Sequence, residues 1–372
     1  MSARRMTTVA ILASVLFTAS ACTVGPDYKR PAVTLPDRYR GAGETSAGTA
    51  SSLADQKWWE VFQDEQLQAL IRTALARNYD LQIAAARILQ VRAQLGIVRA
   101  DQFPTVAVGA SATRERVARS LNFPAAQFST LEVDVAAAWE IDFWGKFRRA
   151  TEAARALLVA SEWGRRAIVT TLISQVAGAY FDLRELDLEL EIAKRTLASR
   201  EESLRLTQVR EQGGATSLLD VRQAEQLVFD ARGAIVDLER AIEQQENLVS
   251  TLIGANPADV PRGQLLVDQP RPVDLPAGLP SALLARRPDI QQAEQELVAA
   301  NANIGVARAA YFPQISLTGA GGFQSAALAS LFSGPAAMFA AGAALTQPIF
   351  TAGKLKSNVA LASARRDEAV LR

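Results

Sequence analysis

The sequence contains no histidine and only one cysteine among its 372 residues. The absence of histidine removes the commonest general base and metal ligand. The single Cys22 excludes an intramolecular disulfide and any metal site made of several cysteines. The 40 Lys and Arg residues are balanced by 39 Asp and Glu residues, so no basic footprint for nucleic acid is present. No nucleophile–base set or phosphate-binding loop is recognisable, so the sequence predicts a protein that is not an enzyme, without cofactor, metal or nucleic acid.

The first 21 residues have the pattern of an export signal. Arg4 and Arg5 precede an apolar run over 6–17, and small residues lead up to Cys22. The run is too short to span a bilayer well. The pattern favours cleavage before Cys22 and lipidation of that cysteine, which would anchor the chain to a membrane. A chance buried cysteine within an uncleaved anchor is the alternative.

Residues 22–56 are rich in Pro, Gly, Ser and Thr, which predicts an extended, lipid-anchored tether. The residue after Cys22 is Thr23 rather than an aspartate, and in this the chain resembles bacterial lipoproteins that are sent to the outer membrane. Trp58 and Trp59 then begin ordered structure.

An internal repeat dominates the remaining sequence. Residues 75–104 align without a gap with residues 284–313, at a constant offset of 209. Both copies carry apolar residues at alternating steps of three and four, which is typical of a helix in coiled-coil packing. The shared stripe runs through Leu81, Ala84, Ile88, Val91, Leu95 and Val98 in the first copy.

Each repeated helix ends at a Phe-Pro pair, Phe103-Pro104 and Phe312-Pro313. Proline pushes the preceding residue out of the helical region, so the helix must stop there. The apolar period then changes from 3.5 to 2, which predicts a strand after each proline.

The stretch 130–143 alternates strictly between an apolar face and a polar face. Such alternation over about a dozen residues is typical of a membrane barrel strand, although a soluble amphipathic strand is the alternative. The polar face is acidic, and we interpret it as facing a lumen, where it either favours cations or hydrates the pore. The predicted lumen residues are Glu132, Asp134, Glu140 and Asp142.

A Gly-Lys pair follows each hairpin, Gly145-Lys146 and Gly353-Lys354, and glycine permits the sharp turn into the next helix. After Gly145 no proline occurs until Pro257. Two apolar lines run along the predicted helices, so each helix contacts neighbours on two sides, as in a helical tube.

The predicted strands require partners from other chains. Four strands cannot close a barrel, and open sheet edges are not tolerated in lipid. The sequence therefore predicts that several copies combine their strands, without specifying how many.

Several motifs together resemble the TolC-like outer-membrane factors, and specifically the lipoprotein subgroup that serves resistance–nodulation–division (RND) efflux pumps (NodT/OprM-like). They are the run Cys22–Pro31, the Trp58-Trp59 pair, the Phe-Pro junctions and the run Pro348–Lys354. The resemblance implies long antiparallel coiled-coil helices forming an α-barrel. It implies two β-hairpins per protomer in a shared trimeric barrel of twelve strands. It also implies a passive outer-membrane duct for small toxic compounds, docked to a periplasmic adaptor and an inner-membrane RND pump.

The resemblance also suggests a periplasmic gate and adaptor tip within Gln212–Gln223. Asp220 stands where a family member's aspartate helps to hold the tube shut, with Arg210 and Arg222 as candidate partners. The remaining tip residues are Gly213, Gly214, Thr216 and Leu219. The alternative is an ordinary helix start capped by Thr216 or Ser217.

We expect two repeats of unequal length. The first covers residues 57–278, with a hairpin over 105–143 and helices over 146–212 and 216–253. The second covers 279–372, with a hairpin over 314–350 and only the start of a long helix. Because the second copy stops early, we expect a partial sequence or a truncated product, and a defective duct if the protein ends there.

Two alternative functions stay open on the sequence alone. One is the outer-membrane duct of a type I protein secretion system, which would share the fold, although the lipoprotein start at Cys22 favours efflux. The other is a lipid-anchored periplasmic coiled-coil structural protein without a barrel.

Overall fold

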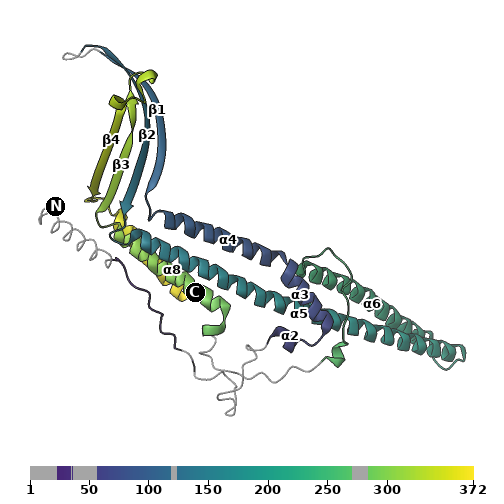
Figure 1. Ribbon diagram of the computed structural model, residues 1–372. Coiled ribbons are helices and arrows are strands. Elements are labelled where there is room, and N and C mark those ends of the chain that lie inside the picture. The colour runs from purple at the N-terminus through teal and green to yellow at the C-terminus, as the bar shows by residue number, and fades with distance from the viewer. Residues whose placement is uncertain (1–22, 35, 37–56, 119–123, 270–283) are drawn as a thin grey trace. The chain divides into compact units, whose positions relative to one another are not determined.

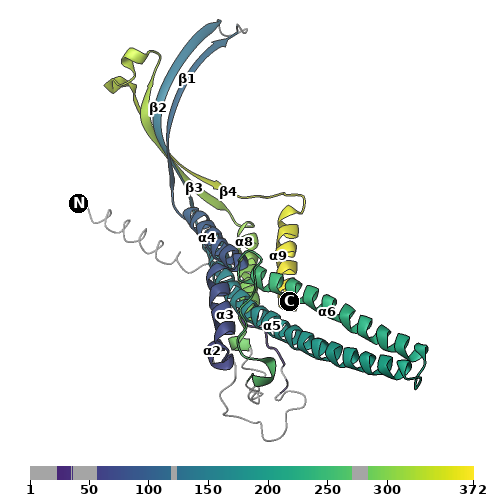
Figure 2. The same cartoon turned by 90° about the vertical axis from the view of Figure 1, so that its right-hand side faces the viewer.

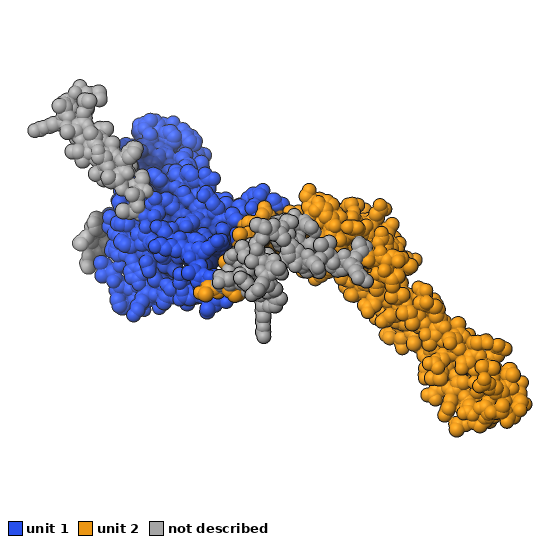
Figure 3. All heavy atoms as spheres, turned by 90° about the horizontal axis from the view of Figure 1, so that it is seen from below, with its two compact units in different colours: residues 1–33, 88–162, 291–372 blue, residues 34–87, 163–290 orange. Residues whose placement is uncertain are grey.

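The computed structural model describes residues 23–34, 36, 57–118, 124–269 and 284–372 (Figures 1 and 2). The chain forms two compact units (Figure 3). Unit 1 comprises residues 1–33, 88–162 and 291–372, and unit 2 comprises residues 34–87 and 163–290. None of the helices in the described ranges is both long and apolar enough to cross a lipid bilayer.

Unit 1 contains a four-stranded antiparallel sheet in the order β1-β2-β3-β4. The strands are β1 (Thr105–Val117), β2 (Ala126–Ile141), β3 (Gln314–Ser325) and β4 (Ala337–Thr346). The first and second hairpins are joined through the β2–β3 pairing, with Ile141 opposite Ile315 and Leu131 opposite Ser325. Strands β1 and β4 each have one side without a strand partner in the described part of the chain.

The two faces of the sheet differ in polarity, as the alternation predicts. Residues directly opposite each other share a face, so the register places Val108, Val135 and Gly321 on one row of the apolar face. This face carries large exposed side chains, of which Phe339 is 88% and Val108 77% exposed. The others are Val106, Val135, Trp139, Leu317 and Leu345.

The repeat is visible in the bounds of the elements. Helix α4 spans Tyr79–Ala100 and α8 spans Pro288–Ala309, so both ends are offset by 209 residues. The following strands begin at Thr105 and Gln314, again 209 residues apart. The equal spacing confirms that each Phe-Pro pair lies between a repeated helix and a repeated strand.

The second strand of each hairpin leads to a further helix. Helix α5 runs from Lys146 to Gln212 without interruption, and α9 spans Lys354–Leu371. Strands β2 and β4 end at Ile141 and Thr346, so both are shorter than the hairpins expected to reach 143 and 350. In the second repeat β4 ends well before α9 begins, because Pro348 lacks the N–H group that a strand ladder needs.

Unit 2 is helical and has its own apolar core. It contains α2 (Trp58–Val61), α3 (Glu65–Arg77), the 3₁₀ turn η4 (Leu266–Asp268) and α6 (Leu218–Leu252), together with residues 163–212 of α5. The fully buried core residues come from three helices: Leu67, Ile71 and Ala74 from α3, Val176, Tyr180 and Leu183 from α5, and Val249 from α6. This core brings α3, α5 and α6 together.

Asn78 separates α3 from α4. Its Oδ1 accepts a hydrogen bond from the Leu81 N–H at 3.1 Å, which caps α4. Its Nδ2 donates to the Leu252 carbonyl at 2.9 Å, near the end of α6. The Asn78 side chain, which follows α3 directly, therefore caps the start of α4 and bonds to the end of α6.

Candidate functional site

The first candidate region is the place where helices meet strands in unit 1. Two indoles bond to the chain at these junctions. Trp139 Nε1 donates to the Gln102 carbonyl at 3.0 Å, beside Phe103-Pro104. Trp144 Nε1 donates to the Pro313 carbonyl at 2.8 Å, and its ring stacks on Phe312 with centroids 4.6 Å apart. Because Phe312 and Trp144 belong to different repeats, this stack ties the two repeats together.

Two of the four predicted lumen carboxylates are bound at the start of α5. Asp142 accepts hydrogen bonds from the N–H groups of Phe147 at 3.1 Å and Arg148 at 2.8 Å. Glu140 pairs with the Lys146 ammonium at 3.0 Å. A carboxylate at a helix N-terminus is stabilised by the free N–H groups there. Asp142 also lies beyond the end of β2, so it belongs to the helix start rather than to the strand.

The two Gly-Lys turns have similar backbones and different surroundings. Gly145 and Gly353 adopt left-handed φ angles of +78° and +84°. A Cβ on Gly145 would lie 2.7 Å from the Thr23 methyl, whereas a Cβ on Gly353 would meet nothing within 4 Å among the described atoms. The chain that follows Cys22 therefore covers only the first turn.

Residues 23–30, which we call the N-terminal strap, dock along α5 and α8. The Val24 N–H donates to the Trp144 carbonyl at 3.1 Å, and Asn301 Nδ2 donates to the Pro26 carbonyl at 2.8 Å. The backbone of Gly25 approaches Gly305 so closely that a Cβ on Gly25 would lie 2.5 Å from the Gly305 Cα. The backbone of residues 23–30 is therefore bonded to the residue before the Gly145 turn and to α8, while most of the predicted tether over 22–56 lies outside the described residues.

Ion pairs hold the middle and the C-terminal end of the strap. Asp27 Oδ1 accepts from Arg149 Nη2 at 2.7 Å. Arg30 forms two bonds to Glu294, one of them from Nε at 2.6 Å, and the Tyr28 hydroxyl donates to the same carboxylate at 3.1 Å. Arg30 beside it lowers the pKa of Glu294. Cys22 itself lies outside the described residues, so its predicted lipidation stays a prediction.

The repeat supplies a matched test of the strap. Gly305 in α8 and Gly96 in α4 occupy equivalent positions, 209 residues apart. A Cβ on Gly305 would lie 2.7 Å from the Val24 carbonyl oxygen and 2.9 Å from Arg149 Cγ, whereas one on Gly96 would meet nothing within 4 Å. We expect Gly305→Ala to make the strap cleavable by added protease at least about tenfold faster, since overpacking costs about 1–3 kcal/mol.

Gly96→Ala is the control, and alanine there is expected to leave cleavage unchanged or slow it slightly, because alanine favours helix. The measurement is the rate at which an added protease cuts the purified protein within residues 23–30, followed by mass spectrometry of the shortened chain. Equal rates for the two variants would contradict a docked strap.

The other two predicted lumen residues, Glu132 and Asp134, lie on the polar face of the sheet. Asp134 has glycine on both sides, with Gly109 opposite on β1 and Gly322 opposite on β3. A Cβ on Gly109 would lie 2.6 Å from Asp134 Oδ1, so the carboxylate occupies the space over that glycine. The cross-strand rows that contain Glu132 and Asp134 therefore form an acidic part of the polar face.

The predicted tip is the turn between α5 and α6, where Gly213 and Gly214 interrupt the helices. Gly214 has a φ of +73°. Asp220 Oδ2 accepts from the Thr216 hydroxyl at 2.5 Å, the Ser217 hydroxyl at 2.7 Å and the Ser217 N–H at 2.9 Å. The Thr216 hydroxyl, followed by the two Ser217 donors, lowers the pKa of Asp220 to about 2.

Neither predicted partner of Asp220 bonds to it within the described chain. Arg222 pairs with Glu225 at 2.6 Å. Within the described ranges, no carboxylate lies at ion-pair distance from Arg210, and Leu219 is exposed. Ser217 and Asp220 form a reciprocal capping box, so the local structure matches the capped helix start and does not bring Asp220 to either arginine.

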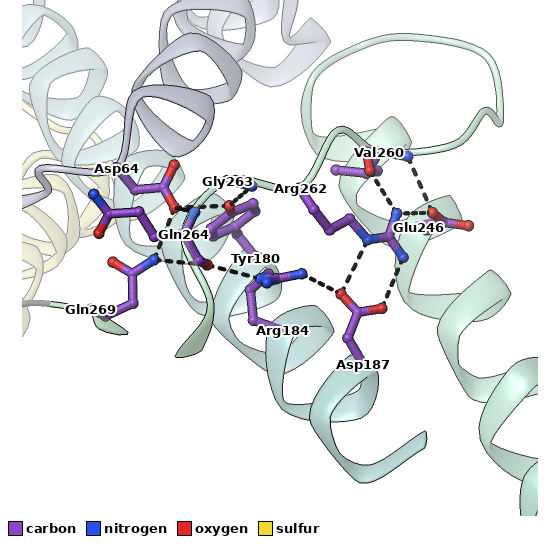
Figure 4. Close-up of polar contacts among 10 residues, drawn as sticks. All are labelled: Asp64, Tyr180, Arg184, Asp187, Glu246, Val260, Arg262, Gly263, Gln264 and Gln269. Atoms are coloured by element: carbon purple, nitrogen blue, oxygen red, sulfur yellow. Dashed lines mark hydrogen bonds and ion pairs between the residues drawn. The ribbon is translucent and has the colours of Figure 1, made fainter. Parts of the chain in front are cut away.

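Figure 4 shows a buried polar cluster in unit 2. The sequence analysis does not predict this cluster. Asp64 is 1% exposed and caps α3 through the N–H groups of Gln66 and Leu67. Its other oxygen accepts from the Tyr180 hydroxyl at 3.0 Å, the Gln264 N–H at 3.0 Å and Gln269 Nε2 at 2.8 Å. One carboxylate therefore joins α3, α5 and the segment 263–269.

The same contacts determine the ionisation of Asp64 and Tyr180. Burial alone would raise the pKa of Asp64, but hydrogen bonds from Gln269, Leu67, Tyr180 and Gln264 outweigh it and lower the pKa. Burial raises the pKa of Tyr180 to about 12, and its bond to Asp64 acts in the same direction. Asp64 is therefore a carboxylate and Tyr180 a neutral donor.

Arginines continue the cluster toward α6. Arg184 donates to the Gln264 carbonyl at 3.2 Å and pairs with Asp187 at 2.7 Å. Arg262 binds Asp187 with two nitrogens, at 3.1 and 3.2 Å, and also pairs with Glu246 of α6. All these charges are paired, which indicates a rigid fastening of the segment 260–269 rather than a reactive site. In the part of the chain that the structure describes, no group of three His, Cys, Asp or Glu side chains could hold a metal ion.

Comparison with known proteins identifies the family. Residues 70–255 and 279–372 match the family described as "Outer membrane efflux protein". The chain is 36% identical over 362 residues to the probable efflux pump outer membrane protein TtgC of Pseudomonas putida, covering 96% of this chain and 75% of the relative. It is 33% identical over 358 residues to the cation efflux system protein CusC of Escherichia coli O6:H1, covering 96% and 77%.

Solved structures agree with this assignment. The outer-membrane channel OprN superimposes with a TM-score of 0.85 at 31% identity, covering 94% of this chain and 78% of that chain. The open MtrE channel of Neisseria gonorrhoeae gives a TM-score of 0.82 at 35% identity, with the same coverage. The predicted fold class of long coiled-coil helices with antiparallel hairpins is thereby confirmed. The chain therefore belongs to the outer membrane efflux protein family, and it is a non-enzymatic outer-membrane channel of an efflux pump.

Proposed function

We propose that the protein is the passive exit duct of a tripartite efflux pump, and that three copies assemble into one channel. The observation that carries this proposal is the sheet of unit 1. Its apolar face is exposed along all four strands, and both of its outer strands have an open side in the described structure. Such a sheet needs lipid against the face and further strands at the edges.

The helices support the periplasmic part of the proposal. Helix α5 has 67 residues, which corresponds to about 100 Å at 1.5 Å per residue. Exposed apolar side chains along α5 and α6, such as Leu206, Val209 and Val236, leave surfaces for neighbouring helices of the other copies. The turn at Gly213–Leu219 would meet the periplasmic adaptor, and the inner-membrane RND pump would supply the energy.

The lipid anchor is part of the same proposal. The strap begins at Thr23, directly after Cys22, and lies beside the Gly145 turn where β2 leads into α5. An acylated Cys22 would then lie close to the end of the sheet, where a membrane surface is expected. This arrangement supports lipidation of Cys22 over a free N-terminal tether.

The exported compounds are proposed to be small and toxic, with the pump selecting them. The relatives include proteins named for antibiotic, toluene, solvent and cation efflux. Glu132 and Asp134 on the polar face would hydrate the lumen and favour cations over anions.

The test is complementation of a strain that lacks its own outer-membrane efflux channel, with the matching adaptor and pump co-expressed. We expect lower accumulation of a fluorescent substrate dye, together with a heat-modifiable trimer in the outer-membrane fraction. A secreted protein in the medium instead of dye efflux would indicate a type I secretion duct. A monomer or dimer without β signal in circular dichroism would rule out the channel.

The role of Asp220 can be tested by removing its charge and keeping its cap. Glutamine at this position preserves the capping box, so Asp220→Gln isolates the charge. If the charge helps to hold the tip shut, we expect single-channel conductance in planar bilayers to rise about twofold or more, since charge-assisted contacts between copies at the tip would be lost. Because the pKa is about 2, this contribution should be constant between pH 8 and pH 4.

Glu211→Gln is the matched control, since Glu211 lies in the last turn of α5 and lacks the hydroxyl donors of Asp220. It should leave conductance unchanged. Wild-type conductance for Asp220→Gln would show that Asp220 only caps α6.

A further inference from the structure

The apolar face of the first hairpin ends abruptly in arginines. On β1 the residues of this face are Val106, Val108, Ala110 and Ala112, followed by Arg114 and Arg116. The register shows the same change on β2. Leu131 lies opposite Ala112, whereas Ser129 lies opposite Arg114 and Gln127 opposite Arg116. Two consecutive rows of this face are therefore basic and polar where all earlier rows are apolar.

These guanidinium groups are not neutralised. Arg114 Nη2 donates to Gln127 Oε1 at 3.4 Å, which links the two rows across the strands. Neither Arg114 nor Arg116 has a carboxylate at ion-pair distance within the described structure, and both side chains are exposed. Glu115 lies between them in the sequence, but alternation places it on the opposite face. The outward side of the hairpin therefore carries two free positive charges about 7 Å apart along the strand.

The height of the arginines matches the edge of a membrane. Trp139, whose indole bonds at the helix junction, lies near one end of the apolar face, where an interfacial aromatic residue is expected, and only the row of Ile141 follows it. Ser129, opposite Arg114, lies ten residues farther along β2. Ten residues span about 34 Å, which rises about 25 Å at a strand tilt of about 40°, the thickness of the apolar band of a barrel. Arg114 thus stands where the hydrocarbon should end on the side away from the helices.

We propose that Arg114 and Arg116, together with Ser129 and Gln127, bind the phosphate of an anionic lipid head group at this outer boundary. The planar guanidinium fork matches phosphate oxygens in two-pronged bonds, and the hydroxyl and amide add neutral donors. The proposal rests on the proposed channel function, which places the helices in the periplasm and this end of the hairpin at the outer leaflet. The ligand is therefore a phosphorylated glycolipid of that leaflet rather than free phosphate or an inner-leaflet phospholipid.

The test measures binding of a bisphosphorylated lipid A to the purified full-length protein in neutral detergent by native mass spectrometry. We expect Arg114→Gln with Arg116→Gln to weaken binding at least about tenfold, since each arginine near an anionic lipid surface strengthens binding about fivefold. The same lipid with its phosphates removed should bind the wild type no better than it binds the double variant. Inorganic phosphate, added as a competitor, should not displace the lipid.

Two further variants make the result specific. Arg72 is also exposed and also donates to a glutamine oxygen, at 2.8 Å, but it lies on α3. Arg72→Gln should bind lipid as the wild type does. Arg114→Lys with Arg116→Lys keeps the charge and loses the fork, so an intermediate affinity is expected.

Each outcome decides one question. Equal binding by the wild type and the glutamine double variant, or equal binding of the dephosphorylated lipid, overturns the phosphate site. Displacement by inorganic phosphate would indicate a general anion site and would also overturn a lipid site. Fractionation of the same cells separates this from failure of the channel, because a wild-type protein absent from the outer membrane would remove both proposals.

Discussion

Alanine in place of Gly322 is expected to reduce assembly of the channel strongly. Gly322 lies opposite Asp134 where β3 pairs with β2, which is the only pairing that joins the two hairpins among the described strands. A Cβ at this position would collide with the Val133 carbonyl oxygen and lie 2.6 Å from the Asp134 Cα. Both are backbone atoms, which cannot move aside without separating the strands.

The expected size follows from the cost of overpacking, about 1–3 kcal/mol per copy. Since a factor of 5–30 in the folded population accompanies about one or two kcal/mol, we expect the heat-modifiable oligomer to fall to about a tenth of the wild-type amount. The measurement is gel mobility of outer-membrane extracts without and with heating, together with dye efflux.

Gly321→Ala is the matched control, one residue away on the same strand. A Cβ there would have its nearest neighbour, the Met338 carbonyl oxygen, at 3.9 Å, which is ordinary contact. Gly321→Ala should assemble normally. Assembly of both variants to the same extent would show that the β2–β3 backbone approach is not needed.

Replacing Asp64 by alanine should produce the largest loss of stability in unit 2. Five donors lose their acceptor, namely the N–H groups of Gln66, Leu67 and Gln264, the Tyr180 hydroxyl and the Gln269 amide. Buried donors left unpaired and a lost helix cap together cost about 3–5 kcal/mol. We expect a clear fall in the midpoint of thermal unfolding, followed by helical circular dichroism in detergent.

Two further variants serve as comparisons for Asp64→Ala. Tyr180→Phe removes a single hydroxyl and should lower the midpoint by less than Asp64→Ala. Asp182→Ala, on the exposed side of α5 two residues from Tyr180, should have almost no effect. If Asp64→Ala behaved like Asp182→Ala, the cluster would not be holding unit 2 together.

The pH dependence of the Asp64 contribution has a definite sign. Its pKa is lowered in the folded protein from an ordinary value of 3.8. A group whose folded pKa is depressed stabilises the protein above its unfolded pKa, and the contribution is lost as pH falls through the folded pKa. The difference between wild type and Asp64→Ala should therefore be constant from pH 8 to pH 5 and shrink below pH 3.8.

The repeat explains why so much of unit 1 could be predicted from sequence. Local patterns define α4 and α8, and the Phe-Pro pairs mark where the period changes, so these elements follow from short-range rules. The strap could not be found in this way. Its partners lie 122 residues away in Arg149 and 264 residues away in Glu294, and its own composition is typical of a flexible linker.

Side-chain roles were harder to predict than elements. Asp142 continues the alternation of β2 in sequence, but it accepts hydrogen bonds from the free N–H groups at the start of α5. Tyr180 lies within an apolar helical stretch, where nothing signals a buried carboxylate. A local signal did exist for Asp142, since an acidic residue just before a helix start is typical of helix capping.

The order of the strands restricts the symmetry of any assembly. All four connections to helices leave from one end of the sheet, at Thr105, Ile141, Gln314 and Thr346. In copies that keep their helices on the same side of a membrane, two β4 strands side by side would run parallel, whereas β4 beside the next copy's β1 runs antiparallel. The contact is therefore heterologous, each copy using a different edge on each side. An open row of copies leaves an unpaired β1 edge at one end and an unpaired β4 edge at the other, so all edges are paired only when a cyclic ring closes, and the ring's strand number is a multiple of four.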